Sequence, residues 1–116
     1  MTSEGDHQGP SSRQAVWICR HGTRINDVDP SWKGVDPHLA TEGVIQAKKT
    51  GIRLRDEGIQ HIFASPFLRT IETAHHIAEA LDLSVKIENG ICEWLTPDWF
   101  SEFPRCRSLD ELCKRF

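Results

Sequence analysis

An amphipathic stretch at residues 65–83 restricts the fold more than any other part of the sequence. Ser65 is a good N-cap for a helix, and Pro66 suits the first helical position. Short apolar stretches typical of strands, residues 61–65 and 84–88, stand directly before and after it. The order strand, helix, strand with short connections predicts parallel strands joined by a right-handed crossover. The apolar residues of the helix recur at intervals of three and four, as on a helix with one buried face: Phe67, Ile71, Ala74, Ala78 and Leu81.

The same alternation extends toward the N-terminus. Residues 15–19 form an apolar run that we interpret as a short buried strand, and residues 25–38 contain the Asp, Pro and Gly typical of a loop. Thr41 can cap a helix that runs to about Glu57, with Gly58 as its stop. We therefore predict an α/β fold, a three-layer sandwich with a mostly parallel sheet. In the helix that Thr41 can cap, the residues expected on the buried face are Val44, Ala47, Gly51 and Ile52.

The two ends of the sequence differ in character. Residues 1–14 are polar and lack an apolar core, which predicts a disordered tail before a domain over residues 15–116. Ser108 and Glu111 have the spacing of a capping box, which predicts the start of a helix close to Phe116. Three strands make a thin sheet for this fold class. We therefore expect a partial domain, incomplete at its C-terminus.

Composition excludes several classes of partner. The formal net charge of −3 argues against nucleic acid, because no global positive field would attract it. The sequence contains neither a secretory signal nor an apolar run of membrane-spanning length, which favours a cytoplasmic protein with no membrane partner. No zinc-binding spacing or Gly-rich nucleotide loop occurs, so we predict no cofactor and no metal. The cysteines fit a reducing compartment because they lack a disulfide or zinc pattern: Cys19, Cys92, Cys106 and Cys113.

Basic residues follow two of the predicted strands. Arg20 and Arg24 come after residues 15–19, and Arg69 lies in the first turn of the helix at 65–83. Ligands of open parallel sheets bind beyond the carboxyl ends of the strands, where these loops meet. A cation at a helix N-terminus opposes the helix dipole unless an anion lies between them. A solvated arginine is the simpler interpretation for each residue alone, but together they predict an anion site. The planar guanidinium suits the oxygens of a phosphorylated substrate, either a small molecule or a phosphoprotein.

His21 lies between two of these arginines. Neighbouring cations lower the pKa of an imidazole, so a neutral ring is available near neutral pH. A neutral imidazole can attack phosphorus and hold the phosphoryl group covalently. The alternative is a hydrogen-bonded structural histidine at the end of a strand, which the flanking Arg20 and Arg24 make less attractive.

Three segments also resemble a known family. Residues 20–24 (RHGTR) resemble the RHG signature of the histidine phosphatase superfamily, also called phosphoglycerate-mutase-like. Residues 64–74 (ASPFLRTIETA) are similar to its second motif. Residues 90–94 (GICEW) look like the segment that supplies an acid in one branch of phosphatases. The first motif alone is a weak signal, but all three in this order, with strand and helix alternating between them, are specific.

The resemblance implies a phosphomonoester hydrolase and a role for each matching residue. His21 would be the nucleophile that becomes phosphohistidine. Glu93 would protonate the leaving oxygen and then help water attack the phosphohistidine. A surface role for Glu93 is the alternative. The arginines would bind the phosphoryl oxygens and stabilise their charge in the transition state: Arg20, Arg24 and Arg69.

Two features leave other functions open. Arg24 favours a phosphatase, because the mutase branch usually has a small hydroxyl residue at this position. No histidine follows His76, whereas the family uses a second pocket histidine late in the domain. His75 and His76 are expected to be surface residues rather than substitutes for it. The alternatives are therefore mutase-type phosphoryl transfer, or a non-catalytic phosphate-binding or inactive fragment that lacks the second histidine.

Overall fold

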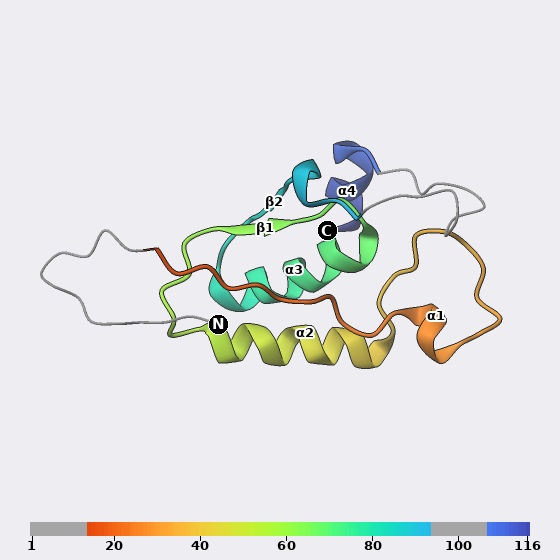
Figure 1. The fold of residues 1–116 in the computed structure, drawn as a ribbon, viewed down its shortest axis with the longest axis horizontal. Coiled ribbons are helices and arrows are strands. Elements are labelled where there is room, and N and C mark those ends of the chain that lie inside the picture. Colours follow the sequence, from red (N-terminus) through yellow and green to blue (C-terminus); the bar gives the residue numbers. More distant parts are fainter. Residues whose placement is uncertain (1–13, 94–106) are drawn as a thin grey trace, which may run out of the picture.

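The computed structural model describes residues 14–93 and 107–116, so nearly all of the predicted tail lies outside the described residues. Figure 1 shows two long helices beside a small sheet, with a short helix at the C-terminal end. Within the described residues, no helix combines the length and apolar character needed to cross a membrane. The elements follow in the order α1 (Ile25–Val28), α2 (Thr41–Leu54), β1 (Ile62–Ala64), α3 (Leu68–Leu81), β2 (Val85–Ile87), the 3₁₀ helix η1 (Asn89–Ile91) and α4 (Leu109–Arg115).

The sheet confirms the predicted crossover. Strands β1 and β2 pair in parallel, with Ile62 opposite Val85 and Ala64 opposite Ile87, and α3 connects them. Parallel strands need such a connection because a short turn cannot bring the chain back to the same end. The α/β class with a parallel sheet is therefore confirmed. The core between sheet and helices is formed by Ala64, Ile71, Ala74 and Leu112, with Ile62, Val85 and Ile87 packed against it.

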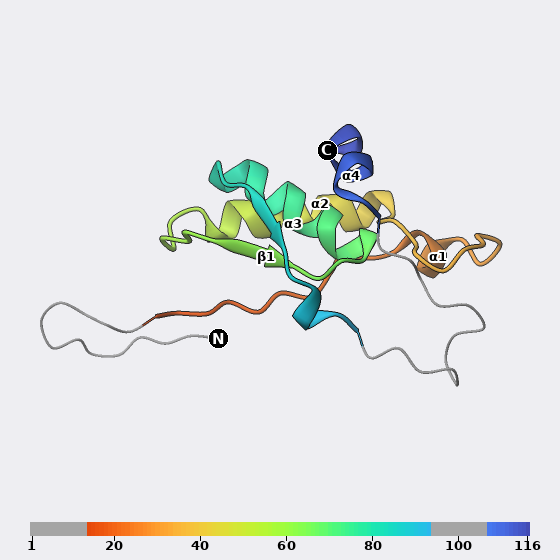
Figure 2. The same cartoon turned by 90° about the horizontal axis from the view of Figure 1, so that it is seen from above.

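The strand predicted at residues 15–19 does not form. This segment is extended in Figure 1 but separated from β1 when the molecule is viewed from above in Figure 2. Val16 is 71% exposed and Ile18 is 89% exposed. A strand requires hydrogen bonds to a neighbouring strand, and among the described residues the sheet consists of β1 and β2 only. The prediction of a buried strand is therefore wrong, because within the described residues this segment pairs with neither β1 nor β2.

Helix α2 packs against α3 through small residues. A Cβ atom on Gly51 would lie 2.8 Å from the Cβ of Ala80, so glycine permits this close approach. Thr41, predicted to be the N-cap, is the first helical residue; the N-cap is Ala40, and the helix ends at Leu54 rather than near residue 57. Ala47 and Gly51 are buried as predicted, together with Gly43 and Leu54. Ile52, predicted to face inward, is exposed.

The N-terminus of α3 differs from the prediction because a distant residue caps it. The N-cap position is Phe67, not Ser65, whose hydroxyl instead donates to Thr70 Oγ1 over 2.8 Å. The backbone N–H of Leu68 donates to Asp36 Oδ1 over 2.9 Å. A carboxylate at a helix N-terminus is favourable both as a hydrogen-bond acceptor and as a negative charge near the dipole.

Two shorter helices complete the described structure. Helix α1 lies within residues 25–38, which we had predicted to be a loop throughout. Helix α4 has the predicted capping box, with Ser108 Oγ accepting from the Glu111 N–H over 3.2 Å. Leu112 of α4 is buried in the core, and Arg115 lies 3.9 Å from Glu72 of α3.

Candidate active site

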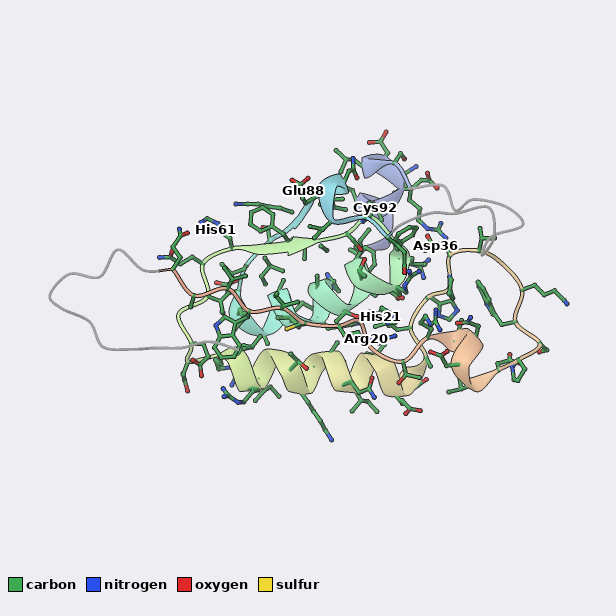
Figure 3. The ribbon with its side chains drawn as sticks, in the orientation of Figure 1. Arg20, His21, Asp36, His61, Glu88 and Cys92 are labelled. Atoms are coloured by element: carbon green, nitrogen blue, oxygen red, sulfur yellow. The ribbon has the colours of Figure 1, made fainter. Side chains whose placement is uncertain are left out.

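The predicted site lies where the extended segment 14–20 reaches the two long helices. Figure 3 shows Arg20 and His21 at the end of this segment, beside α2 and α3. The loop that follows is tied to residues 38–40 by backbone hydrogen bonds: Ala40 donates to the Thr23 carbonyl over 2.9 Å, and Ile25 donates to the His38 carbonyl over 2.8 Å. These bonds fix the backbone immediately after His21.

Gly22 fits this position because both helices approach it closely. Its N–H donates to Thr73 Oγ1 over 3.0 Å, and that hydroxyl donates to the Arg69 carbonyl over 2.8 Å. A Cβ on Gly22 would lie 2.6 Å from the Gly43 carbonyl oxygen, a backbone atom that cannot rotate away. Glycine at this position therefore allows α2 to approach the loop closely.

His21 has a defined tautomer. Its Nδ1 lies 2.8 Å from the Gly22 carbonyl oxygen. A carbonyl only accepts hydrogen bonds, so Nδ1 must carry the proton and Nε2 of the neutral ring keeps its lone pair. The pKa of His21 is lowered, chiefly by partial burial. The hydrogen bond to Gly22 opposes this shift, whereas the positive charges of Arg69, Arg20 and Arg24 lower the pKa further.

Arg69 is buried and paired with Glu93. It is 7% exposed, and its Nη2 donates to Glu93 Oε2 over 2.6 Å. Its guanidinium carbon lies 4.7 Å from the centre of the Phe67 ring, which fixes the plane of the charged group. Its Nε is buried and has no hydrogen-bond partner among the described residues. A buried donor without an acceptor is unfavourable, so an incoming anion would improve the site.

Arg24 has a partner that the sequence analysis missed. Its Nη2 and Nε donate to the two carboxylate oxygens of Asp27 over 2.9 and 3.1 Å. This pairing lowers the pKa of Asp27 to about 2 and raises that of Arg24. The charge of Glu93 also raises the pKa of Arg24, which indicates that the two side chains lie within electrostatic range. The i,i+3 spacing of Arg24 and Asp27 at a helix start was the available signal.

The predicted residues are therefore brought together to different degrees. His21 and Arg69 are linked through Gly22 and Thr73, and Glu93 joins them through Arg69. Arg20 is exposed, and its side chain makes no hydrogen bond or ion pair within the described residues, although its charge acts on His21. Thr73, which bridges Gly22 and Arg69, is the main residue of this network that the sequence analysis missed.

Comparison with known proteins identifies the class. The family model described as histidine phosphatase superfamily (branch 1) matches residues 16–108. The chain belongs to this superfamily.

Individual relatives extend this finding. The chain is 41% identical over 111 residues to the Saccharomyces cerevisiae transcription factor tau 55 kDa subunit, covering 87% of the chain and 25% of that protein. It is 35% identical over 88 residues to the Bos taurus fructose-2,6-bisphosphatase TIGAR, covering 71% of the chain and 33% of that protein. The fold matches the ecdysone phosphate phosphatase from Bombix mori in complex with tungstate with a TM-score of 0.71 and 24% identity, over 83% of the chain and 51% of that structure. The chain thus spans a third or less of these two relatives and about half of the solved phosphatase.

Proposed function

We propose that this chain provides the nucleophile and the phosphate clamp of a phosphomonoester hydrolase. The observation that carries the proposal is the state of His21, an Nδ1-protonated imidazole whose pKa is lowered by burial and by three arginines. A neutral Nε2 beside a cluster of positive charge suits attack on an anionic phosphoryl group. Membership of the superfamily and the likeness to a bisphosphatase support this assignment.

In the proposed reaction, His21 Nε2 forms a bond to phosphorus while the bond from phosphorus to the ester oxygen breaks. Glu93, which takes up a proton from solvent once the phosphate has displaced it from Arg69, gives that proton to the leaving oxygen, which departs as an alcohol. Water then attacks the phosphohistidine, Glu93 takes a proton from it, and the nitrogen–phosphorus bond breaks to release phosphate. The arginine charges stabilise the phosphoryl oxygens throughout: Arg20, Arg24 and Arg69.

The ion pair between Arg69 and Glu93 has a role in this scheme. At 2.6 Å it occupies one guanidinium nitrogen before substrate binds. A phosphate dianion would compete with the carboxylate for this nitrogen and release Glu93 toward the leaving oxygen. The half-exposed Glu93 side chain has room for that movement, whereas the buried Arg69 does not.

A second candidate is phosphate binding without turnover. It is favoured by the exposure of Arg20, whose side chain makes no hydrogen bond or ion pair within the described residues, so that the clamp has fewer fixed donors. Mutase-type transfer is disfavoured because the mutase branch usually has a small hydroxyl residue at the position of Arg24. Hydrolysis and phosphate binding differ in one observable. Both require the arginines, but only hydrolysis requires the His21 nitrogen.

The test compares two histidine variants of the tag-free chain with p-nitrophenyl phosphate as substrate. His38→Ala is the matched control, because His38 Nδ1 also lies 2.8 Å from the carbonyl of the next residue. The proposal predicts turnover by the wild type and by His38→Ala, and none by His21→Ala. Turnover that survives in His21→Ala would contradict it. Vanadate-dependent thermal stabilisation without any turnover would establish the binding function instead.

A further inference from the structure

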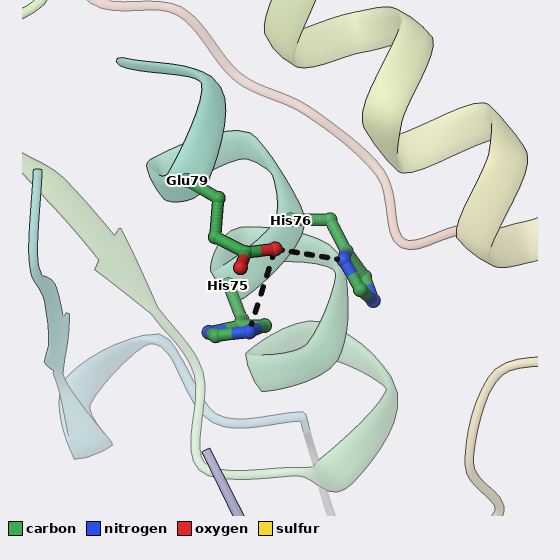
Figure 4. A group of neighbouring side chains, drawn as sticks. All are labelled: His75, His76 and Glu79. Atoms are coloured by element: carbon green, nitrogen blue, oxygen red, sulfur yellow. Dashed lines mark ion pairs between the residues drawn. The ribbon is translucent and has the colours of Figure 1, made fainter. Parts of the chain in front are cut away.

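A second cluster of chemically active side chains lies on α3, in its C-terminal half. Figure 4 shows the Glu79 carboxylate between the imidazoles of His75 and His76. Glu79 Oε1 lies 3.6 Å from His75 Nε2 and 3.4 Å from His76 Nδ1. One ligand atom from each residue lies within 4.8 Å of the other two.

These separations fit a small metal ion. A tetrahedral Zn²⁺ bound at its usual distances holds neighbouring ligand atoms about 3.3–3.5 Å apart. The two distances that involve Glu79 are already close to that value. The two imidazole nitrogens lie within 4.8 Å of each other, and rotation about the side-chain bonds can adjust this separation.

The two histidines are held by packing, and apart from Glu79 no hydrogen-bonding partner engages the buried nitrogen of His76 within the described residues. His76 Nδ1 is buried and makes no hydrogen bond within the described part of the chain. The ring of His75 contacts the rings of His76 and Phe116, with centroids 5.2 and 4.8 Å apart. Packing therefore orients these imidazoles, while the Glu79 side chain, 60% exposed, keeps one side of the cluster open to solvent.

We propose that His75, His76 and Glu79 bind a divalent transition metal ion, with Zn²⁺ as the type case. Two imidazoles and one carboxylate suit Zn²⁺, Co²⁺ or Ni²⁺, whereas Mg²⁺ and Ca²⁺ prefer oxygen ligands alone. Three protein ligands leave a fourth position for water or another small ligand. The bound ion would join the C-terminal half of α3 and, through the ring contact of His75, the end of α4.

This site departs from our sequence-based expectation of no metal and of surface roles for both histidines. Adjacent residues on a helix point about 100° apart, so the pair His75 and His76 gave no recognisable ligand spacing. The residue that completes the group is Glu79, which stands one helical turn from both. The site does not depend on the proposed phosphatase chemistry and uses none of its residues.

The test measures Zn²⁺ binding to the tag-free chain by calorimetry and by thermal unfolding. We expect one ion per chain and a melting temperature that rises with Zn²⁺ concentration. Both effects should be lost in His76→Ala and in Glu79→Ala, and kept in the control His61→Ala, whose histidine is exposed and lies 3.1 Å from Lys86 Nζ. Glu79 is a surface residue, so its variant should fold even if the loss of His76 disturbs α3.

Co²⁺ provides a second readout, which distinguishes metal binding at this site from metal binding by the cysteines. Co²⁺ bound by nitrogen and oxygen should show visible bands without the near-ultraviolet charge-transfer band of a thiolate. No uptake by the wild type, equal uptake by Glu79→Ala, or a thiolate band would each overturn the proposal.

Discussion

Removal of the Thr73 hydroxyl should uncouple the His21 loop from α3. Thr73→Val has nearly the same shape but no oxygen to accept from Gly22 N–H, which now donates to it over 3.0 Å. Thr73 is only 7% exposed, so water cannot easily replace that acceptor. A buried donor left without a partner costs about 1–3 kcal/mol. We therefore expect Thr73→Val to lower the free energy of unfolding by this amount.

Thr73→Ser is the matched control, because it keeps the hydroxyl and loses one methyl group. Its cost should be about 0.8 kcal/mol, the value for one buried carbon. Urea unfolding of the three proteins measures both differences. Phosphate affinity, measured by calorimetry, should fall in Thr73→Val and change little in Thr73→Ser. Equal stability and equal affinity of the two variants would refute the claim that this hydroxyl positions the loop.

Four further predictions concern the same region. The ring protons of His21, followed by NMR, should titrate below 6.5, and Arg69→Met should move the transition upward because one positive charge is removed. Because the pKa of His21 is lower in the folded chain, the unfolded chain binds this proton at a higher pH. The free energy of unfolding should therefore decrease as the pH falls below 6.5, and thermal melts of His21→Gln should lack this part of the pH dependence. Gly43→Ala should destabilise the chain by about 1–3 kcal/mol in urea unfolding, because its Cβ would lie 2.2 Å from the Thr23 carbonyl oxygen. The pKa of Asp27 is lowered from 3.8 to about 2, so its contribution to stability is complete above pH 3.8 and is lost as the pH falls through about 2. Thermal melts of Asp27→Asn should not show this loss of stability in acid.

Local patterns predicted the parts of the fold that local interactions determine. The stripe from Phe67 to Ala78 is buried on α3, and both flanking strands form within one residue of the expected bounds. The capping box at Ser108 also forms, because its two partners are three residues apart. In each case the residues that decide the structure are neighbours in the sequence.

Contacts between distant segments account for the errors. The N-terminus of α3 is capped by Asp36, 32 residues away, so Ser65 was a reasonable but wrong choice. Residues 15–19 have a strand-like pattern, but in the described chain they pair with neither β1 nor β2. Gly22 gave no sign of its packing against α2, because that contact depends on the position of Gly43.

The sequence could propose the candidate residues but not the contacts between them. Charge and motif spacing selected His21, Arg69 and Glu93 as candidates, and the structure places Arg69 in contact with Glu93. The sequence could not show that Thr73 bridges the backbones of Gly22 and Arg69, because a buried threonine on a helix is common.

The most direct test of the central claim is to trap the phosphorylated protein. The wild-type chain is mixed with p-nitrophenyl phosphate, quenched under alkaline conditions that preserve phosphoramidates, and mapped by mass spectrometry. Our account predicts one phosphoryl group on His21, absent from His21→Ala and present in His38→Ala. Hydrolysis of the ester with no phosphoryl group on His21 at any quench time, or with the group on another residue, would contradict it.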